Sequence, residues 1–254
     1  MSTILLAIDA FSPLDRLLPA ALLLATRQHA ELLAVFSQDD SLISGAALSC
    51  TQEVGANSAI CYPVTSTSIE KRVQRIADDM RQSLSKAAER QQIPWGFQQC
   101  CSSISRIMTE TDAEIVIPGW RASPWSGPKS LHLTPRRTST NPFILVIDDG
   151  LPCSAHVIEV ARGLAGTSGQ LEMIILGLHS AFESGSDRRR MSADERKGET
   201  RIPVASTRQL IRQLQILCPT LTLVGREQLA ATDNQIHTAL KSMKCPLALL
   251  GRMH

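Results

Sequence analysis

The chain has 254 residues, of which 43% are hydrophobic, 20% charged and only 4% aromatic. Its length suits two small domains or one large one. Few aromatics argue against base-stacking surfaces for single-stranded nucleic acid, and a formal charge of +2 gives no pull toward nucleic acid or acidic membranes. The seven cysteines include no CxxC pair, so we expect buried, reduced thiols, no metal site and no disulfide framework.

A β-α-β pattern opens the chain. Ile4–Ile8 is a continuous apolar run, typical of a parallel strand covered on both faces, and Asp9 follows it. A helix is expected from residue 13 or 14 to about 29, and a strand at Leu32–Phe36. The apolar run at 17–25 is too short to span a bilayer and no basic region precedes it. We therefore predict a cytoplasmic protein that does not associate with membranes.

A long amphipathic helix and a third and fourth strand come next. Thr67 and Glu70 have capping-box spacing, and apolar residues recur behind them at steps of three and four. Trp95–Cys100 is predicted as a strand, followed by a short helix and a strand that ends at Gly119. Residues 121–141 contain three prolines, which favours a loop or a broken helix.

The opening pattern then returns. Ile144–Asp148 repeats the first strand and its aspartate, and an apolar run again follows 22 residues after the aspartate. This is an internal repeat of a β-α-β unit, with a helix near 154–165 and a strand near 171–176. Mixed charges at 183–201 indicate a solvated loop, with a docking patch for an acidic partner as the alternative.

The end of the chain matches the end of the first copy. A helix at 206–217 precedes a strand ending at Gly225, which matches Thr111–Gly119 position for position. A further helix carrying Leu240 and a strand at Leu247–Leu250 follow. The stretch from aspartate to glycine is 33 residues shorter in the second copy (225 − 148 against 119 − 9). We therefore predict that it has lost a strand-helix element or the irregular loop.

This order of elements resembles the universal stress protein family. The resemblance rests on the Ile4–Asp9 opening, the Glu31–Phe36 strand, the long amphipathic helix, the glycine-ended strand and the final Cys245–Leu250 segment. Both halves fit, so the chain resembles a tandem member. This implies an α/β fold of two α/β/α sandwich domains with mainly parallel sheets, at 1–141 and 142–254. Many such domains pair through their last strand, which implies a homodimer or an intrachain pseudo-dimer.

The resemblance also implies where a nucleotide would bind. Members that bind ATP carry an aspartate after strand one, matched by Asp9 and Asp148, and a glycine loop after strand four. Gly119 and Gly225 match its first glycine, which lets backbone amides approach phosphates. The later glycines of the loop are replaced in both copies. The basic residues of the first loop could hold a phosphate or another anion, or be solvated charges: Lys129, Arg136 and Arg137.

A local role competes with nucleotide binding, because a carboxylate after a strand often caps the following turn. The sequence contains no Walker-A, GxGxxG, GxSxG or HExxH motif. We therefore predict a non-enzymatic binding protein with an unknown protein partner, no cofactor, and weak or lost nucleotide binding. The alternative is a stress sensor that binds ATP or AMP through Asp9, Gly119 and the basic loop.

One segment resembles both a last strand and a first strand. Asn141–Ile147 carries a proline before an apolar run, as Cys245–Leu250 does, and also leads to Asp148. A single strand cannot fill both roles in two separate sheets. Our hypothesis is that it opens the second copy and leaves the first copy without a fifth strand.

Overall fold

The computed structural model describes residues 2–38, 44–46, 48, 51–54, 61–119, 142–166, 171–178, 199–217, 219–227, 238, 240 and 245–251. The first half contains β1 (Thr3–Asp9), α1 (Leu14–Gln28), β2 (Glu31–Ser37), β3 (Gln52–Val54), β4 (Cys61–Pro63), α3 (Ser66–Arg90), β5 (Trp95–Cys100), α4 (Ile104–Glu110) and β6 (Ile115–Pro118). The second half contains β7 (Phe143–Asp148), α5 (Pro152–Ala165), β8 (Glu172–Leu178), β9 (Glu199–Val204), α7 (Thr207–Ile216), β10 (Leu221–Gly225) and β11 (Leu247–Leu250).

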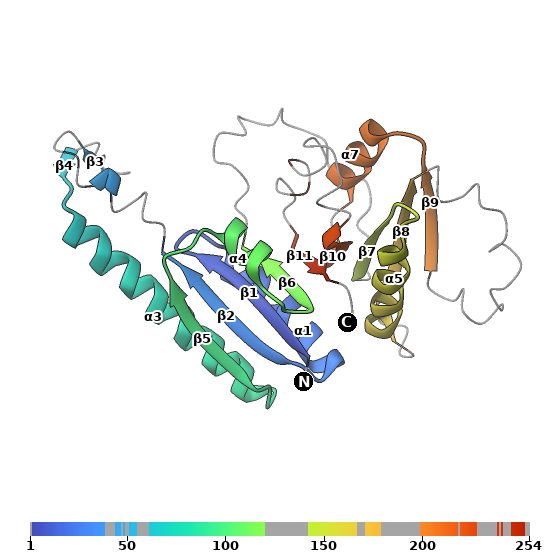
Figure 1. Cartoon of the computed structure of the whole chain (residues 1–254), viewed down its shortest axis with the longest axis horizontal. Helices are drawn as coiled ribbons and strands as arrows, with labels where there is room; N and C mark the ends of the chain where they lie inside the picture. The colour runs from blue at the N-terminus through green and yellow to red at the C-terminus, as the bar shows by residue number, and fades with distance from the viewer. Residues whose placement is uncertain are drawn as a thin grey trace, which may run out of the picture.

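A nine-stranded sheet in the order β5-β2-β1-β6-β11-β10-β7-β8-β9 forms the centre of the molecule, with a separate β3-β4 hairpin (Figure 1). Within each half the strands of the large sheet are parallel, whereas β3 and β4 pair antiparallel. The two halves meet where β11 pairs antiparallel with β6. The prediction of an α/β fold with mainly parallel strands is confirmed. The halves share one continuous sheet instead of forming two separate ones, and the boundary at 141/142 stays a prediction.

The boundary strand belongs to the second half, as the sequence hypothesis required. β7 pairs with β8 on one side and with β10 on the other. Beside β6, where the first half would have its own fifth strand, lies β11 of the second half. The last strand of the second half thus pairs with a strand of the first half inside the chain. The homodimer stays a prediction.

Helices cover both faces of the sheet. Alternate strand residues such as Ile4, Leu6 and Ile8 pack in one core with α1, α3 and α5. The residues between them, such as Leu5 and Ala7, pack in a second core with α4 and α7. This alternation with both faces buried explains the continuous apolar runs of the strands. No described helix has the length and apolar character that crossing a bilayer would need.

The long helix α3 has its N-cap two residues before the predicted one. Thr65 is its N-cap: its side chain accepts from the Ser68 amide at 3.2 Å, and the Ser68 hydroxyl accepts from the Thr65 amide at 3.3 Å. The prediction of Thr67 and Glu70 was therefore wrong. Serine has the short polar side chain needed to complete the same reciprocal arrangement.

The second half keeps a third strand that the sequence did not predict. β9 begins at Glu199, inside the stretch interpreted as a charged loop, so that interpretation was wrong for residues 199–201. The Glu199 carboxylate, only 5% exposed, accepts from Arg162 of α5 at 3.2 Å and from Arg201 at 2.8 Å. These ion pairs let a charged segment serve as an edge strand.

The shortening of the second half lies before β9. Twenty residues separate β8 from β9 (179–198), whereas 57 separate β2 from β5 (38–94) and include the β3-β4 hairpin and α3. The equivalents of β5 and α4, namely β9 and α7, are both present. The second half has therefore kept the strand-helix unit and shortened the connection before it.

The cysteines differ in part from expectation. None of the five described cysteines forms a disulfide; Cys61 and Cys101 are exposed, and the other three are partly buried. The prediction of burial is therefore wrong for Cys61 and Cys101, and the reduced state of the cysteines stays a prediction. Among the described residues, no group of three or more His, Cys, Asp or Glu side chains could hold a metal ion.

Candidate functional site

Three polar residues stand level across the carboxyl edge of the first half. The register pairs Asp9 of β1 with Ser37 of β2, and Ser37 with Cys100 of β5. In open parallel sheets, ligands bind at this edge, at the point where the strand order reverses. That point lies between β1 and β6. Asp9 is the last residue of β1, and Gly119 directly follows β6.

Ser12 joins Asp9 to Gly119. Its Oγ lies 2.8 Å from Asp9 Oδ1 and 2.8 Å from the Gly119 carbonyl, and it accepts from the Asp9 amide at 2.9 Å. The Asp9 carboxylate also accepts from the Phe11 amide at 2.9 Å. The single hydroxyl proton of Ser12 serves one of its two acceptors at a time. The aspartate therefore caps the turn after β1, and that turn is fastened to the end of β6.

Gly119 is a glycine for a steric reason. A Cβ at this position would lie 2.2 Å from Ser12 Oγ, 2.7 Å from Ser12 Cβ and 3.0 Å from the Ala7 carbonyl. The Gly119 amide also donates to that carbonyl at 2.6 Å. Close approach of Ser12 thus accounts for the glycine without any ligand.

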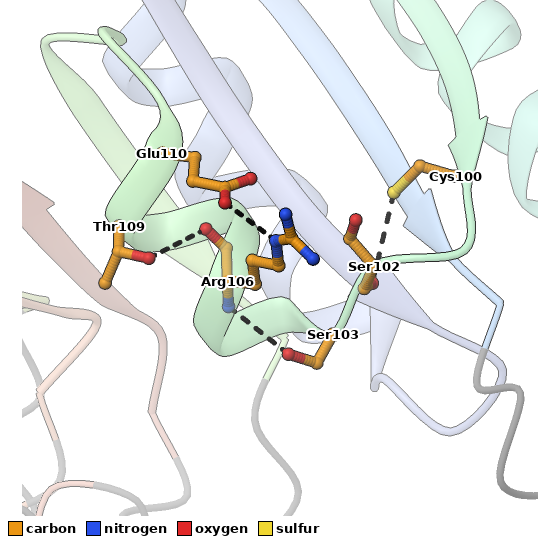
Figure 2. A network of polar contacts seen from close by, with 6 residues as sticks. All are labelled: Cys100, Ser102, Ser103, Arg106, Thr109 and Glu110. Atoms are coloured by element: carbon orange, nitrogen blue, oxygen red, sulfur yellow. Dashed lines mark hydrogen bonds and ion pairs between the residues drawn. The ribbon is translucent and has the colours of Figure 1, made fainter.

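The other end of the row is ordered by a network around α4 (Figure 2). Ser37 Oγ donates to the Ser102 carbonyl at 2.6 Å, and the Cys100 thiol lies 4.0 Å from the same oxygen. Ser103 caps α4 by accepting from the Arg106 amide at 3.3 Å. The turn between β5 and α4 is therefore held against β2, which fixes the position of Ser37 and Cys100.

A small cavity of about 320 Å³ lies beside this row. It is lined by Gln38, just after β2, and by residues of the first turns of α3: Glu70, Lys71, Val73 and Gln74. Gln38 Nε2 donates to Gln99 Oε1 at 3.1 Å. Its lining residues include two amides and one charge of each sign beside apolar side-chain surface, but neither Asp9 nor Gly119.

The second half presents a different row at its carboxyl edge. Asp148 pairs with Gly177 of β8, and Gly177 pairs with Pro203 of β9, so the aspartate carries the only polar side chain of this row. Asp148 Oδ1 accepts from the Gly150 amide at 3.0 Å, which caps the turn as Asp9 does. The buried Ser154 donates to Asp149 at 2.6 Å rather than to the strand-end aspartate.

The residue after Gly225 faces the first half. Arg226 donates from Nη1 to the Thr111 carbonyl at 3.0 Å and from Nη2 to the Ala113 carbonyl at 2.7 Å. Burial lowers the pKa of its guanidinium, and the charge of Asp112 raises it. The residue that follows β10 thus holds the connection between α4 and β6 in place.

The two strand-end sites lie at opposite edges of the sheet. Because β11 runs antiparallel to β6, the carboxyl edge of one half adjoins the amino edge of the other. The Gly251 amide, after β11, accordingly donates to the carbonyl of Glu114, which precedes β6, at 2.8 Å. The structure brings Asp9 to Gly119 and places Asp148 and Gly225 on neighbouring strands, but it keeps the two pairs apart.

The copies also differ in register. When the strand pairings are extended to the strand ends, Gly225 is level with Asp148, whereas Gly119 is level with Ile8. The position-for-position match of the two glycine-ended strands therefore does not extend to their pairing. A shift of one residue places the two glycines differently relative to their aspartates.

Three predicted basic residues, Lys129, Arg136 and Arg137, lie outside the described residues. Three residues that matter to the geometry of the site were not predicted from the sequence: Ser12, Ser37 and Arg226. Ser12 follows Asp9 by three residues, a spacing that suits a side chain closing a turn, and it could have been noticed. Nothing local in the sequence indicates that Arg226 reaches the other half.

A crystal structure of a universal stress protein from Archaeoglobus fulgidus DSM 4304 superimposes with a TM-score of 0.51. The match covers 98% of this chain and 96% of that one, at 11% sequence identity. The chain therefore has the fold of a universal stress protein. At this identity the likeness concerns the fold alone.

Two further solved structures have TM-scores too low to carry an argument. They are MurG of Acinetobacter baumannii (0.22; 10% identity; 94% of this chain and 76% of that one) and the glycosyltransferase SnogD of Streptomyces nogalater (0.23; 12%; 88% and 76%). No family model and no curated protein matches the sequence.

Proposed function

We propose that this chain is a universal stress protein-like binding protein of the cytoplasm, without enzymatic activity, whose nucleotide binding is weak or lost. Its partner would be another protein. The observation that carries the proposal is the Asp9–Ser12–Gly119 corner, where the chain's own groups occupy the place that the family resemblance assigns to a nucleotide.

Two bonds keep the Asp9 carboxylate in its turn, one with the Phe11 amide and one with the Ser12 hydroxyl. A ribose or phosphate that used this carboxylate would have to compete with the hydroxyl. The Gly119 carbonyl already lies within hydrogen-bond distance of the same hydroxyl. Since replacing satisfied bonds yields little net free energy, this corner favours weak binding.

The second half supports the proposal for a different reason. Its edge row offers Gly177 and Pro203 where the first half offers Ser37 and Cys100. Two side-chain hydrogen-bonding groups are thereby absent from the row, and Arg226 is engaged with carbonyls of the other half. We therefore expect any small-molecule binding to be confined to the first half.

An ATP- or AMP-binding sensor is the second candidate. The cavity at Gln38 and Lys71 favours this candidate, because it adjoins the row that begins at Asp9. A lysine and two amides could contact a phosphate or a base edge. In this version the nucleotide would enter beside β2 and leave the Ser12 corner intact.

Calorimetry on ligand-stripped protein separates the candidates. We expect no saturable heat with ATP or AMP up to millimolar concentration and no steady release of phosphate from ATP. Micromolar binding of either nucleotide, retained in Asp148→Ala, would establish the sensor and reject our proposal. Loss of that binding in Asp9→Ala would assign it to the Ser12 corner instead of the cavity. Lys71→Ala then tests the cavity beside β2, and steady ATP turnover would return the enzyme class.

A further inference from the structure

The outer side of α1 borders an apolar groove. The groove runs between α1 and the last turns of α3 and has a volume of about 840 Å³. Its apolar lining comes from Leu14, Leu18, Pro19, Leu22, Leu23 and Ala87. Thr26 donates to Gln91 at 3.1 Å across one end. The opposite side of α1 carries residues such as Leu17, Ala21 and Leu24, which are buried against the sheet.

One acidic and one basic residue mark the ends of this surface. Asp15 lies in the first turn of α1 and Arg27 in the last, and both line the groove and are exposed. Neither forms an ion pair with another described residue. Twelve residues of helix place them about 18 Å apart, with the apolar residues in between.

A helix that ran antiparallel to α1 would complement this pattern. Its acidic residue would belong at its N-terminus, beside Arg27, and its basic residue at its C-terminus, beside Asp15. Both placements also suit the partner helix's own dipole. α1 itself meets this description, because its acidic residue is in the first turn and its basic residue is in the last.

We propose that α1 and its groove form an interface with a second copy of this chain. A twofold axis would run α1 antiparallel to α1 of the partner, so that Asp15 meets Arg27 of the partner subunit and the reverse pair forms at the other end. The leucines and Pro19 would pack between the two pairs. This surface is separate from the candidate nucleotide site, and the inference does not depend on the proposed function.

The sheet itself supplies an argument for using this helix face. β11, the last strand, already pairs with β6 inside the chain, and β10 covers its other side. Both sides of β11 are therefore paired within the chain, and a strand of a second copy cannot pair with it. The remaining edges are β5 and β9, at its two ends.

A charge swap tests the interface. Sedimentation velocity over a concentration series should show a reversible dimer for the unmodified chain. Asp15→Arg or Arg27→Asp alone would place like charges together twice in each dimer and raise its Kd by about tenfold or more. The double variant Asp15→Arg/Arg27→Asp restores opposite charges at both ends and should bring the Kd back to within about threefold of the original.

A matched reversal on the other face of the sheet serves as control. Arg106 and Glu110 form an exposed ion pair on α4, with side chains 66% and 58% exposed. Arg106→Glu should leave the Kd unchanged, with circular dichroism confirming that all variants are folded. A chain that stays monomeric at every concentration, or a dimer indifferent to both single reversals, would overturn the proposal. Failure of the double variant to recover the dimer would overturn it as well.

Discussion

The two carboxyl edges of the sheet begin alike and continue differently. Each starts with an aspartate that caps the turn after its strand, at Asp9 and at Asp148. In the first half the row continues through Ser37 and Cys100, whereas in the second it continues through a glycine and a proline. The shared aspartate therefore belongs to the turn, and the differences beside it decide what each edge can bind.

The residues around the two glycines differ in the same way. Gly119 gives room to Ser12, which fastens the first turn to β6 within one half. Gly225 leads to Arg226, which fastens the second half to the first. A glycine that resembles the start of a phosphate loop thus has an identifiable structural role in the first half and precedes a clamp between halves in the second.

The largest expected effect comes from closing the space at Gly119. Gly119→Ala would place a methyl group 2.2 Å from Ser12 Oγ and 3.0 Å from a backbone carbonyl. We expect it to lower the free energy of unfolding by about 2–3 kcal/mol, because an overpacked site must shift its backbone. Urea denaturation measures the loss.

The double variant Ser12→Gly/Gly119→Ala identifies the cause. Removing the serine side chain takes away the two nearest atoms, so the double variant should lose less stability than the sum of the single ones. Additive losses would mean that Ser12 is not what requires a glycine at 119.

A smaller effect is expected at the clamp between the halves. Arg226→Ala removes two hydrogen bonds from a charged donor to the Thr111 and Ala113 carbonyls. We expect the free energy of unfolding to fall by about 2 kcal/mol at most, because removing a partly buried charge also removes its desolvation cost. Amide exchange should rise at residues 111–115. The stability of Arg226→Lys should lie between those of the unmodified chain and Arg226→Ala, since one ammonium cannot reproduce the two hydrogen bonds of the planar guanidinium.

The smallest losses of stability are expected at the two strand-end aspartates, Asp9 and Asp148. Asp9→Ala loses contacts with the Phe11 amide and the Ser12 hydroxyl, whereas Asp148→Ala loses one contact with the Gly150 amide. We expect the free energy of unfolding to fall by about 1–2 kcal/mol in Asp9→Ala and by about 1 kcal/mol in Asp148→Ala, as measured by thermal or urea unfolding. Asp9→Asn keeps the Oδ1 acceptor and should stay within about 0.5 kcal/mol of the original. A large loss in Asp9→Asn would show that the negative charge matters to the fold.

Much of the fold could be predicted from the sequence because strand burial is a local pattern. Runs such as Ile4–Ile8 and Leu247–Leu250 are apolar throughout, as two-sided burial requires. β9 was missed because its first residues include the charged Glu199 and Arg201. The Glu199 carboxylate is buried through its ion pairs with Arg201 and with Arg162 of α5. The cap of α3 was misplaced because two overlapping stretches offer the same type of spacing.

The candidate site was only half predictable. Asp9 and Gly119 could be matched to a family pattern, but Ser12 acquires its role only when the end of β6 arrives 107 residues later. Similarly, Arg226 meets its acceptors 113 and 115 residues earlier in the chain. Such contacts depend on the order of strands in the sheet, in which β6 lies between β1 and β11.

The joint between β6 and β11 also bears on how the chain reaches this structure. β6 ends at Pro118 and β11 begins at Leu247, 129 residues later, yet they hydrogen-bond side by side. Until this pairing forms, β6 exposes a buried-type strand, Ile-Val-Ile-Pro, as an open edge. Closing so long a loop is slow, and open apolar edges attract other chains. We expect the first half to acquire its final neighbour late in folding and to be most prone to aggregation before that moment.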